Sequence, residues 1–155
     1  MSNSSVEISD LGKETIEVYK HLHTCIFPTT YPRQFYKEAL EIEGVFKIAH
    51  LNGQPVGVLS TRILDDKQES VRSLYISSLG CRVQARRRGI GSLLLDHAIA
   101  FAVSKQLTLV SLHVQLGNEA AIDFYRAKGF EIERTVPRYY FRLQPSDAYL
   151  MQRKL

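Results

Sequence analysis

The order of apolar segments predicts an α/β fold in which helices pack on a mixed β-sheet. Segments with strand and helix periodicity alternate along the 155 residues, in the order β, α, α, β, β, β, α, β, α, β, β. A strand, a helix and another strand follow one another around residue 90, which favours a right-handed parallel crossover. At this length we expect a single domain, residues 1–155.

The first third of the chain predicts an edge strand and two helices. Residues 6–8 alternate as a strand does, and residues 12–24 carry apolar side chains at helical spacing. The proline of Phe27-Pro28 removes a backbone donor and therefore ends this helix. A second helix is expected from Pro32 to Glu43.

A β-hairpin and a third strand are predicted next. Residues 45–51 and 56–64 are strand-like, and the Asn52-Gly53 dipeptide between them is a strong signal for a tight turn. Residues 65–68 turn again, and residues 73–79 form the following strand.

The C-terminal half predicts two helices and three strands. A helix is expected at 90–105 and a β-branched, apolar strand at 108–114. Asn118 can cap a helix that runs to residue 128, and Gly129 can end it in a left-handed conformation. The remaining strands are expected at 131–136 and 139–143.

Composition excludes several classes of protein. A hydrophobic content of 45% and a charged content of 23% are typical of soluble domains. No apolar run reaches the roughly 20 residues of a membrane span, and the N-terminus does not resemble a secretory signal. With only two cysteines, we expect a reduced, cytosolic protein. The net charge of +4 leaves three partners open for its basic groups: nucleic acid, a polyphosphate cofactor or another anionic partner.

The stretch RRRGIGS, residues 86–92, predicts an anion site between a strand and a helix. Glycines allow a close approach of the backbone, and a helix start offers unpaired N–H groups. A dinucleotide fold would need a third glycine where Leu94 stands, and a P-loop would need a Gly-Lys pair. The remaining alternative is a solvated basic turn at the start of a helix.

Longer motifs resemble a known family. The segment CRVQARRRGIGSLLL resembles motif A of the GNAT superfamily of acetyl-coenzyme A-dependent N-acyltransferases, whose signature is [Q/R]-x-x-G-x-[G/A], and NEAAIDFYRAKGFE is similar to motif B. The segments IFPTTYPRQFYKEAL, LYISSLGC, LHVQLGNEAAIDFYRAKGFEI and RYYFRLQPSDAYL resemble, in order, the NatE catalytic subunit family, which acetylates protein N-termini. This resemblance implies a mostly antiparallel seven-stranded sheet with one splayed parallel strand pair and about four helices.

The resemblance implies acetyl-CoA as the acetyl donor, no metal, and a set of cofactor-binding residues. The pantetheine arm would pair with the backbone near the end of one strand, the pyrophosphate would bind amides of the arginine-glycine turn, and two motif B residues would face the pantetheine and the sulfur. These residues are Leu79, Gly80, Cys81 and Val83; Arg86, Arg87, Arg88, Gly89, Ile90, Gly91 and Ser92; and Asn118 and Tyr125. Read alone, Asn118 is also a helix cap, Tyr125 a core residue and Cys81 a packing residue.

Tyr75 and His113 resemble the catalytic pair of the family. They would share one ordered water at the amine, with His113 as the general base. Read alone, the two are a sheet tyrosine and a core histidine. The peptide would lie between the first loop and the last hairpin, at Phe27, Pro28, Thr29, Tyr31, Ser77, Tyr139, Tyr140, Phe141 and Arg142. Thr29 and Ser77 depart from the valine and methionine usual in the family, which puts the second-residue preference in doubt.

The family resemblance leads us to expect an N-terminal acetyltransferase that prefers an initial methionine. The partners would be N-terminal peptides and a NatA-type complex at the ribosome, with no DNA and no membrane. The location would be the cytoplasm, with the nucleus as an addition. Two alternatives remain: a weakly active accessory subunit of such a complex, and an enzyme that acetylates lysine or small amines.

Overall fold

Seven strands form one hydrogen-bonded sheet in the computed structural model, which describes residues 5–27, 31–41 and 44–155. The strand order is β1-β2-β3-β4-β5-β7-β6, and only β4 and β5 are recorded as parallel neighbours among these residues. The strands are β1 (Val6–Asp10), β2 (Phe46–Leu51), β3 (Gln54–Asp66), β4 (Val71–Cys81), β5 (Leu109–Gln115), β6 (Glu131–Val136) and β7 (Ala148–Lys154). The helices are α1 (Ile16–Ile26), α2 (Arg33–Glu38), α3 (Ile90–Ser104) and α4 (Glu119–Ala127), with a 3₁₀ turn at Val83–Ala85.

The described residues group into two compact units, each made from two separate stretches of chain. The first unit contains Met1–Ile63 and Ile76–Phe101, and the second contains Leu64–Tyr75 and Ala102–Leu155. Strand β4 therefore belongs to both units, since the boundary falls between Tyr75 and Ile76.

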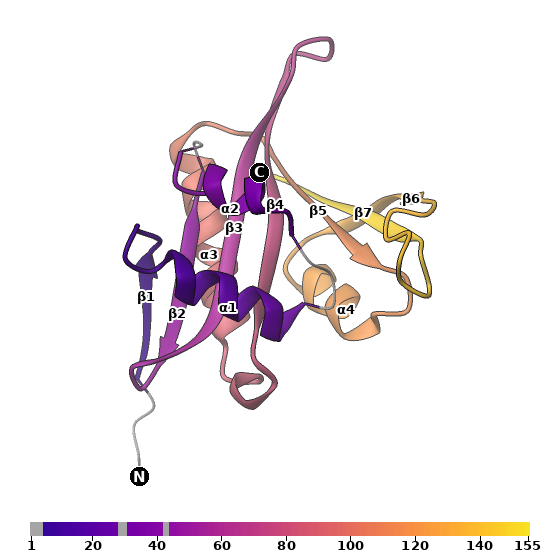
Figure 1. The fold of residues 1–155 in the computed structure, drawn as a ribbon. Helices are drawn as coiled ribbons and strands as arrows, with labels where there is room; N and C mark the ends of the chain where they lie inside the picture. The colour runs from indigo at the N-terminus through magenta and orange to yellow at the C-terminus, as the bar shows by residue number, and fades with distance from the viewer. Residues whose placement is uncertain (1–4, 28–30, 42–43) are drawn as a thin grey trace. The chain divides into compact units, whose positions relative to one another are not determined.

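In the first unit, α1 and α2 cover one face of β2 and β3, and α3 covers the other face (Figure 1). Helix α1 buries Tyr19 and Leu22, three residues apart and hence on one side of the helix. They pack in one core cluster with Tyr36 of α2 and with Ile48 and Val58 of the strands. Burial of such side chains contributes about 1.5–3 kcal/mol each, which holds both helices on the sheet.

This core contains a buried histidine. His23 of α1 is 1% exposed and is ringed by aromatic side chains, including Tyr31 at 4.7 Å and Phe27 at 5.2 Å between ring centroids. Its Nε2 is hydrogen-bonded to Ser78 Oγ at 3.0 Å, whereas its Nδ1 has no partner in the described structure. Burial lowers the pKa of His23 to about 4, because the charged form would lose its hydration. His23 is therefore neutral at physiological pH.

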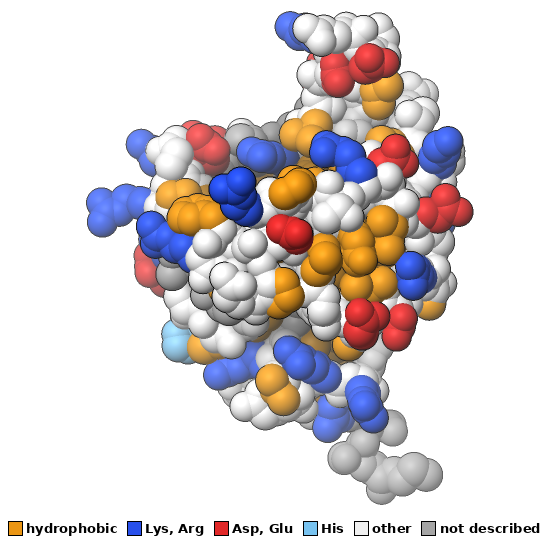
Figure 2. All heavy atoms as spheres, turned by 90° about the vertical axis from the view of Figure 1, so that its right-hand side faces the viewer, with side chains coloured by type: hydrophobic (Ala, Val, Ile, Leu, Met, Phe, Trp, Pro, Cys, Tyr) orange, Lys and Arg blue, Asp and Glu red, His pale blue; other side chains and the backbone are white. Residues whose placement is uncertain are grey.

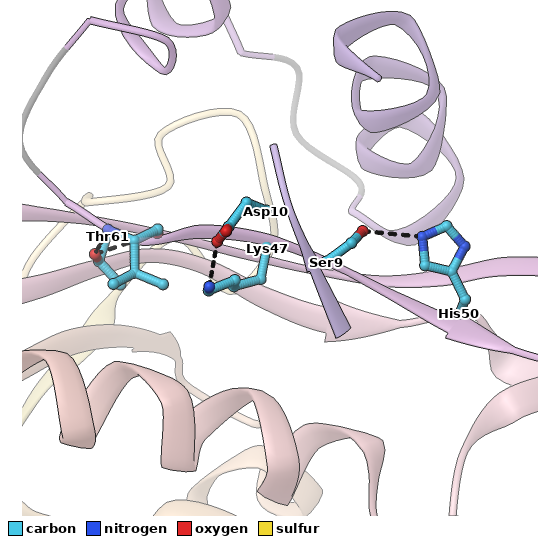
Figure 3. A network of polar contacts seen from close by, with 6 residues as sticks. Ser9, Asp10, Lys47, His50 and Thr61 are labelled. Atoms are coloured by element: carbon cyan, nitrogen blue, oxygen red, sulfur yellow. Dashed lines mark hydrogen bonds and ion pairs between the residues drawn. The ribbon is translucent and has the colours of Figure 1, made fainter. Parts of the chain in front are cut away.

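Side chains also tie the edge strand β1 to β2. Lys47 forms an ion pair with Asp10, and Ser9 Oγ is hydrogen-bonded to His50 Nε2 at 3.2 Å (Figure 3). Both contacts join residues of paired strands in the antiparallel β1–β2 ladder. Exposed contacts of this kind are worth at most about 1 kcal/mol each, so the ladder itself supplies the main connection.

In the second unit, β7 lies between β5 and β6 and pairs with both in the antiparallel sense. Asn118 caps α4, because its Oδ1 accepts a hydrogen bond from the Ala121 N–H at 3.3 Å. Gly129 follows the helix with φ +90°, the left-handed conformation that a glycine stop requires. No helix in the described part of the chain is long and apolar enough to cross a membrane.

Most of the predicted elements are present with shifted ends. Asn52 and Gly53 both have positive φ, as the predicted tight hairpin turn requires. The first helix starts at Ile16 instead of residue 12, because the Thr15 hydroxyl and amide bond back to Gly12 and form a turn. The second helix ends at Glu38, earlier than the predicted residue 43, and residues 42–43 lie outside the described residues.

The predicted strand at 139–143 is wrong. These residues form turns, in which Leu143 N–H bonds to Tyr140 O and Tyr140 N–H bonds to Ser146 O. The last strand is instead β7, which forms seven residue pairs with β5. Tyr139, Tyr140, Phe141 and Arg142 thus belong to the loop between β6 and β7 and not to a hairpin strand.

Candidate active site

The arginine-glycine turn has a backbone suited to an anion. Arg87 and Gly89 adopt positive φ values of 65° and 76°, and α3 starts directly afterwards at Ile90. A Cβ added at Gly89 would meet no heavy atom of the described structure within 4 Å, so the turn is open on that side. The Ile90 side chain is buried and anchors the helix start, while the side chains of Arg86 to Arg88 are exposed. A helix start with this backbone, and with three arginines around it, fits a pyrophosphate.

The end of β4 is packed closely against α1. A Cβ at Gly80 would come within 2.8 Å of Ile26 Cγ2 and 3.1 Å of Phe27 Cζ, so only glycine allows this approach. Leu79 and Cys81 flank it, both partly buried, and Val83 in the 3₁₀ turn is exposed. Burial raises the pKa of the Cys81 thiol, and the Arg86 charge offsets only part of this effect. A raised pKa keeps the sulfur protonated, which supports a packing role over a nucleophilic one.

The two motif B residues hold different positions. Asn118 is exposed at the start of α4, where its oxygen caps the helix and its amide N–H₂ keeps two donors. Tyr125 is buried, edge-on to Phe130 at 5.5 Å between ring centroids, and burial raises its pKa. The cap and core positions are thus established, and their roles toward the pantetheine stay predictions.

The predicted catalytic pair is in direct contact within the second unit. Tyr75 Oη is hydrogen-bonded to His113 Nδ1 at 2.7 Å, and the same hydroxyl is 2.8 Å from Tyr139 Oη. The Tyr139 ring stacks on the His113 imidazole, with centroids 3.9 Å apart and planes at 12°. Tyr140 Oη donates to His113 O at 3.4 Å. Two aromatic residues of the β6–β7 loop therefore position the histidine of β5.

The parallel strand pair brings Tyr75 and His113 together. Leu74 pairs with Val110 and Tyr75 with Ser111, which sets His113 two residues beyond the partner of Tyr75. Strand β5 runs on to Gln115, past the last residue paired with β4, as expected for a splayed pair.

The His113 imidazole is favoured in its neutral form. Burial lowers its pKa below the ordinary value of 6.5, and the positive charge of Arg134 lowers it further. A neutral imidazole has one nitrogen that accepts a proton, so the residue can act as a base at neutral pH. Sequence reasoning missed Arg134. It placed Tyr139 at the peptide site but missed its stacking on His113. Both effects depend on how β6 and its loop pair with distant strands.

The predicted peptide residues fall in both units. In the first unit, Tyr31 Oη donates to the Ser77 backbone carbonyl at 3.2 Å, and Phe27 packs with Tyr31 beside His23. Pro28 and Thr29 lie outside the described residues.

In the second unit, Tyr139 is 40% exposed and Phe141 is 72% exposed, with the Arg142 guanidinium 5.2 Å from the Phe141 ring centroid. Figure 2 shows hydrophobic side chains gathered on the molecular face that it draws, among basic and acidic ones. Exposed aromatic groups next to a base are suited to hold an apolar or peptide ligand.

The fold, the arginine-glycine turn and the contact between Tyr75 and His113 together indicate the class of protein. The chain belongs to the acetyltransferase (GNAT) family, whose model matches residues 13–130. It is 40% identical, over 100% of its length and 84% of the relative, to probable N-acetyltransferase san of Drosophila melanogaster. It is also 40% identical, over 97% of its length and 89% of the relative, to N-alpha-acetyltransferase 50 of Danio rerio.

A solved structure shares the fold over almost the whole chain. Naa50 of Arabidopsis thaliana, in complex with the bisubstrate analogue CoA-Ac-MVNAL, superposes with a TM-score of 0.87 and is 32% identical. The match covers 97% of this chain and 99% of that one.

Proposed function

We propose that this protein transfers an acetyl group from acetyl-CoA to the free α-amino group of protein N-termini, as a NatE-type enzyme that favours an initial methionine. The observation that carries this proposal is the 2.7 Å hydrogen bond between Tyr75 Oη and His113 Nδ1, next to an exposed aromatic ring. The relatives support it, since those named N-alpha-acetyltransferase 50 align over nearly the full chain.

The residues of the arginine-glycine turn are suited to bind the acetyl donor, acetyl-CoA. Left-handed residues at positions 87 and 89 and the open side of Gly89 leave the backbone amides accessible to a pyrophosphate. Acetyl-CoA, when bound, would supply a thioester. Its C–S bond would break as the amine nitrogen forms the new C–N bond, and coenzyme A would leave as a thiolate that takes up a proton. The turn binds and orients acetyl-CoA, and it takes no part in proton transfer.

The proton of the amine is accepted by the Tyr75–His113 pair. An α-amino group has a pKa of about 7.7–8.0, so a useful fraction is already neutral before it binds. As the C–N bond forms, the nitrogen becomes acidic, and His113 accepts its proton through an ordered water that it would share with Tyr75, its hydrogen-bond partner. The stacked Tyr139 keeps the imidazole in place during this transfer.

The experiment is an acetylation assay with short peptides that vary at the first two positions. We expect transfer to peptides that begin with methionine, and none to matched peptides with a blocked N-terminus and an internal lysine. Acetylation of the blocked peptides alone would replace the proposal with a lysine acetyltransferase. A lack of transfer to any peptide, with acetyl-CoA binding intact, would favour an accessory subunit.

We also propose that the protein works in the cytoplasm in association with a NatA-type complex at the ribosome. The family resemblance supports this partner. Sedimentation of ribosomes from a cell that contains the tagged protein tests it, and an exclusively ribosome-free protein would contradict it.

A further inference from the structure

One row of residues crosses three strands and ends at the catalytic histidine. His113 of β5 pairs with Leu150 of β7, and Leu150 pairs in turn with Arg134 of β6. Directly opposed residues of antiparallel strands project to the same face of the sheet. His113 and Arg134 therefore lie on one face, two strand spacings apart, or about 10 Å between backbones. An arginine side chain is long enough to cover much of this separation.

A β-bulge determines which charge occupies that row. Ile132 pairs with Met151, but the next pair is Arg134 with Leu150, so Glu133 is the extra residue. With a regular register, Glu133 would oppose Leu150 and the row would end in a carboxylate. The bulge instead turns Arg134 toward the face of His113, as bulges beside active sites often do.

Arg134 is exposed, and its guanidinium has no ion pair or hydrogen bond recorded in the described residues. Its charge reaches the imidazole, since it contributes to the lowered pKa of His113 and no acidic residue contributes. The β6–β7 loop adds Arg138 and Arg142, and Asp147 is the one acidic residue of that loop. Asp147 is already engaged, because its Oδ1 accepts from the Arg138 backbone N–H at 3.0 Å.

We propose that Arg134 forms a carboxylate subsite that selects substrate peptides with an acidic side chain near the acetylated N-terminus. The proposal rests on the N-terminal acetyltransferase function and narrows its substrate class. An extended peptide advances about 3.3 Å per residue, so two steps from the first residue cover about 7 Å of the roughly 10 Å span, and the arginine side chain covers the remainder. The acidic residue is therefore expected near position three. A guanidinium binds a carboxylate through two parallel N–H···O bonds, which a neutral amide cannot reproduce.

The test compares peptide pairs that begin with methionine and differ only by Glu or Gln at position three. For the wild-type protein we expect kcat/KM to be about 5- to 10-fold higher for the Glu peptide, mainly through KM, as is usual for a partly exposed charged pair. Moving the Glu to positions two, four and five should reduce this ratio. High salt should also reduce it, because the pair is solvent-accessible.

Two variants and a control assign the effect to this residue. Arg134→Gln should bring the Glu/Gln ratio close to one, and Arg134→Glu should favour a Lys peptide over the Glu peptide. Because a ratio is compared, any change in the pKa of His113 cancels between the two peptides. Arg126→Gln is the control, because it removes the same charge from α4 at a residue that does not contribute to the pKa shift of His113. It should leave the Glu/Gln ratio of kcat/KM unchanged.

The outcomes separate this proposal from the function on which it rests. Equal kcat/KM for acidic and neutral peptides, with both acetylated at the N-terminus, overturns the carboxylate subsite and leaves the acetyltransferase function standing. A Glu preference that survives Arg134→Gln overturns it as well. A lack of transfer to every peptide contradicts the proposed function itself.

Discussion

Removing the hydroxyl of Tyr75 should separate catalysis from stability. Tyr75→Phe deletes one oxygen atom, which is 2.7 Å from His113 Nδ1 and 2.8 Å from Tyr139 Oη. The phenyl ring can keep its edge-on position 5.6 Å from the imidazole. The variant therefore changes the proton path and leaves the packing of the site in place.

The two expected magnitudes differ widely. A hydrogen bond contributes about 0.5–1.5 kcal/mol to stability, so we expect the free energy of unfolding to fall by about 1 kcal/mol. Loss of a positioned proton-transfer group lowers kcat by about 10²- to 10⁴-fold, which is roughly 3–5 kcal/mol of activation free energy. If Tyr75 and His113 act as one group, adding His113→Ala to Tyr75→Phe should lower kcat little further.

The assay is steady-state acetylation of a methionine peptide across pH, together with chemical denaturation of each variant. Because the pKa of His113 is lowered by burial and by Arg134, the base is available above that pKa and is lost below it. The wild-type rate should therefore rise as the pH increases through the pKa of His113. The pH profile of His113→Ala should lack this rise.

A matched variant tests whether the loss of any tyrosine hydroxyl at this site lowers kcat to the same extent. Tyr139→Phe keeps the ring that stacks on His113 and removes only the hydroxyl, which bonds to Tyr75 Oη and not to the imidazole, so we expect less than about a 10-fold loss. If Tyr75→Phe keeps kcat within twofold of the wild type, with an unaltered pH profile, the amine loses its proton elsewhere and the pair is structural.

Three further predictions concern the first unit. His23 is neutral when folded, with a pKa of about 4 against 6.5 in an unfolded chain, so stability should be lost as pH falls from 6.5 to 4. His23→Leu should reduce this acid-induced loss by about 3 kcal/mol in denaturation series, and an unchanged slope would contradict the assignment. Gly89→Asn tolerates a positive φ but fills the open side of the turn, so acetyl-CoA affinity by calorimetry should fall. The control Gly53→Asn has a similar positive φ (81° against 76°) and similar open space, and it should bind acetyl-CoA normally. Ser77→Met should change the ranking of second residues in peptide assays with little effect on cofactor affinity; an unchanged ranking would remove Ser77 from the peptide site.

Local signals in the sequence were sufficient to predict much of the fold. The Asn52-Gly53 turn, the Asn118 cap and the Gly129 stop depend on neighbouring residues only, and all three are present. The pair of Tyr75 and His113 could be chosen because strand, helix and strand follow in a known order, although their roles remain to be tested.

The errors have a different physical origin. The aromatic run at 139–143 has the composition of a strand, but its rings are used to stack on and bond with the histidine of a distant strand. Strand β7 contains several polar residues, and it forms because ladders on both sides satisfy its backbone. The placement of Arg134 depends on a bulge, which arises from pairing between strands and leaves no mark in a single segment.

The interleaving of the two compact units limits how this protein can be divided. The chain passes between the units three times, and β4 changes unit between Tyr75 and Ile76. No single cut yields either unit complete, so neither can be exchanged as a cassette by simple recombination of gene segments. A fragment that starts at Ala102 would retain His113 but lose Tyr75. Variation in this protein is therefore expected to occur by substitution within loops, such as the one between β6 and β7, and not by replacement of whole modules.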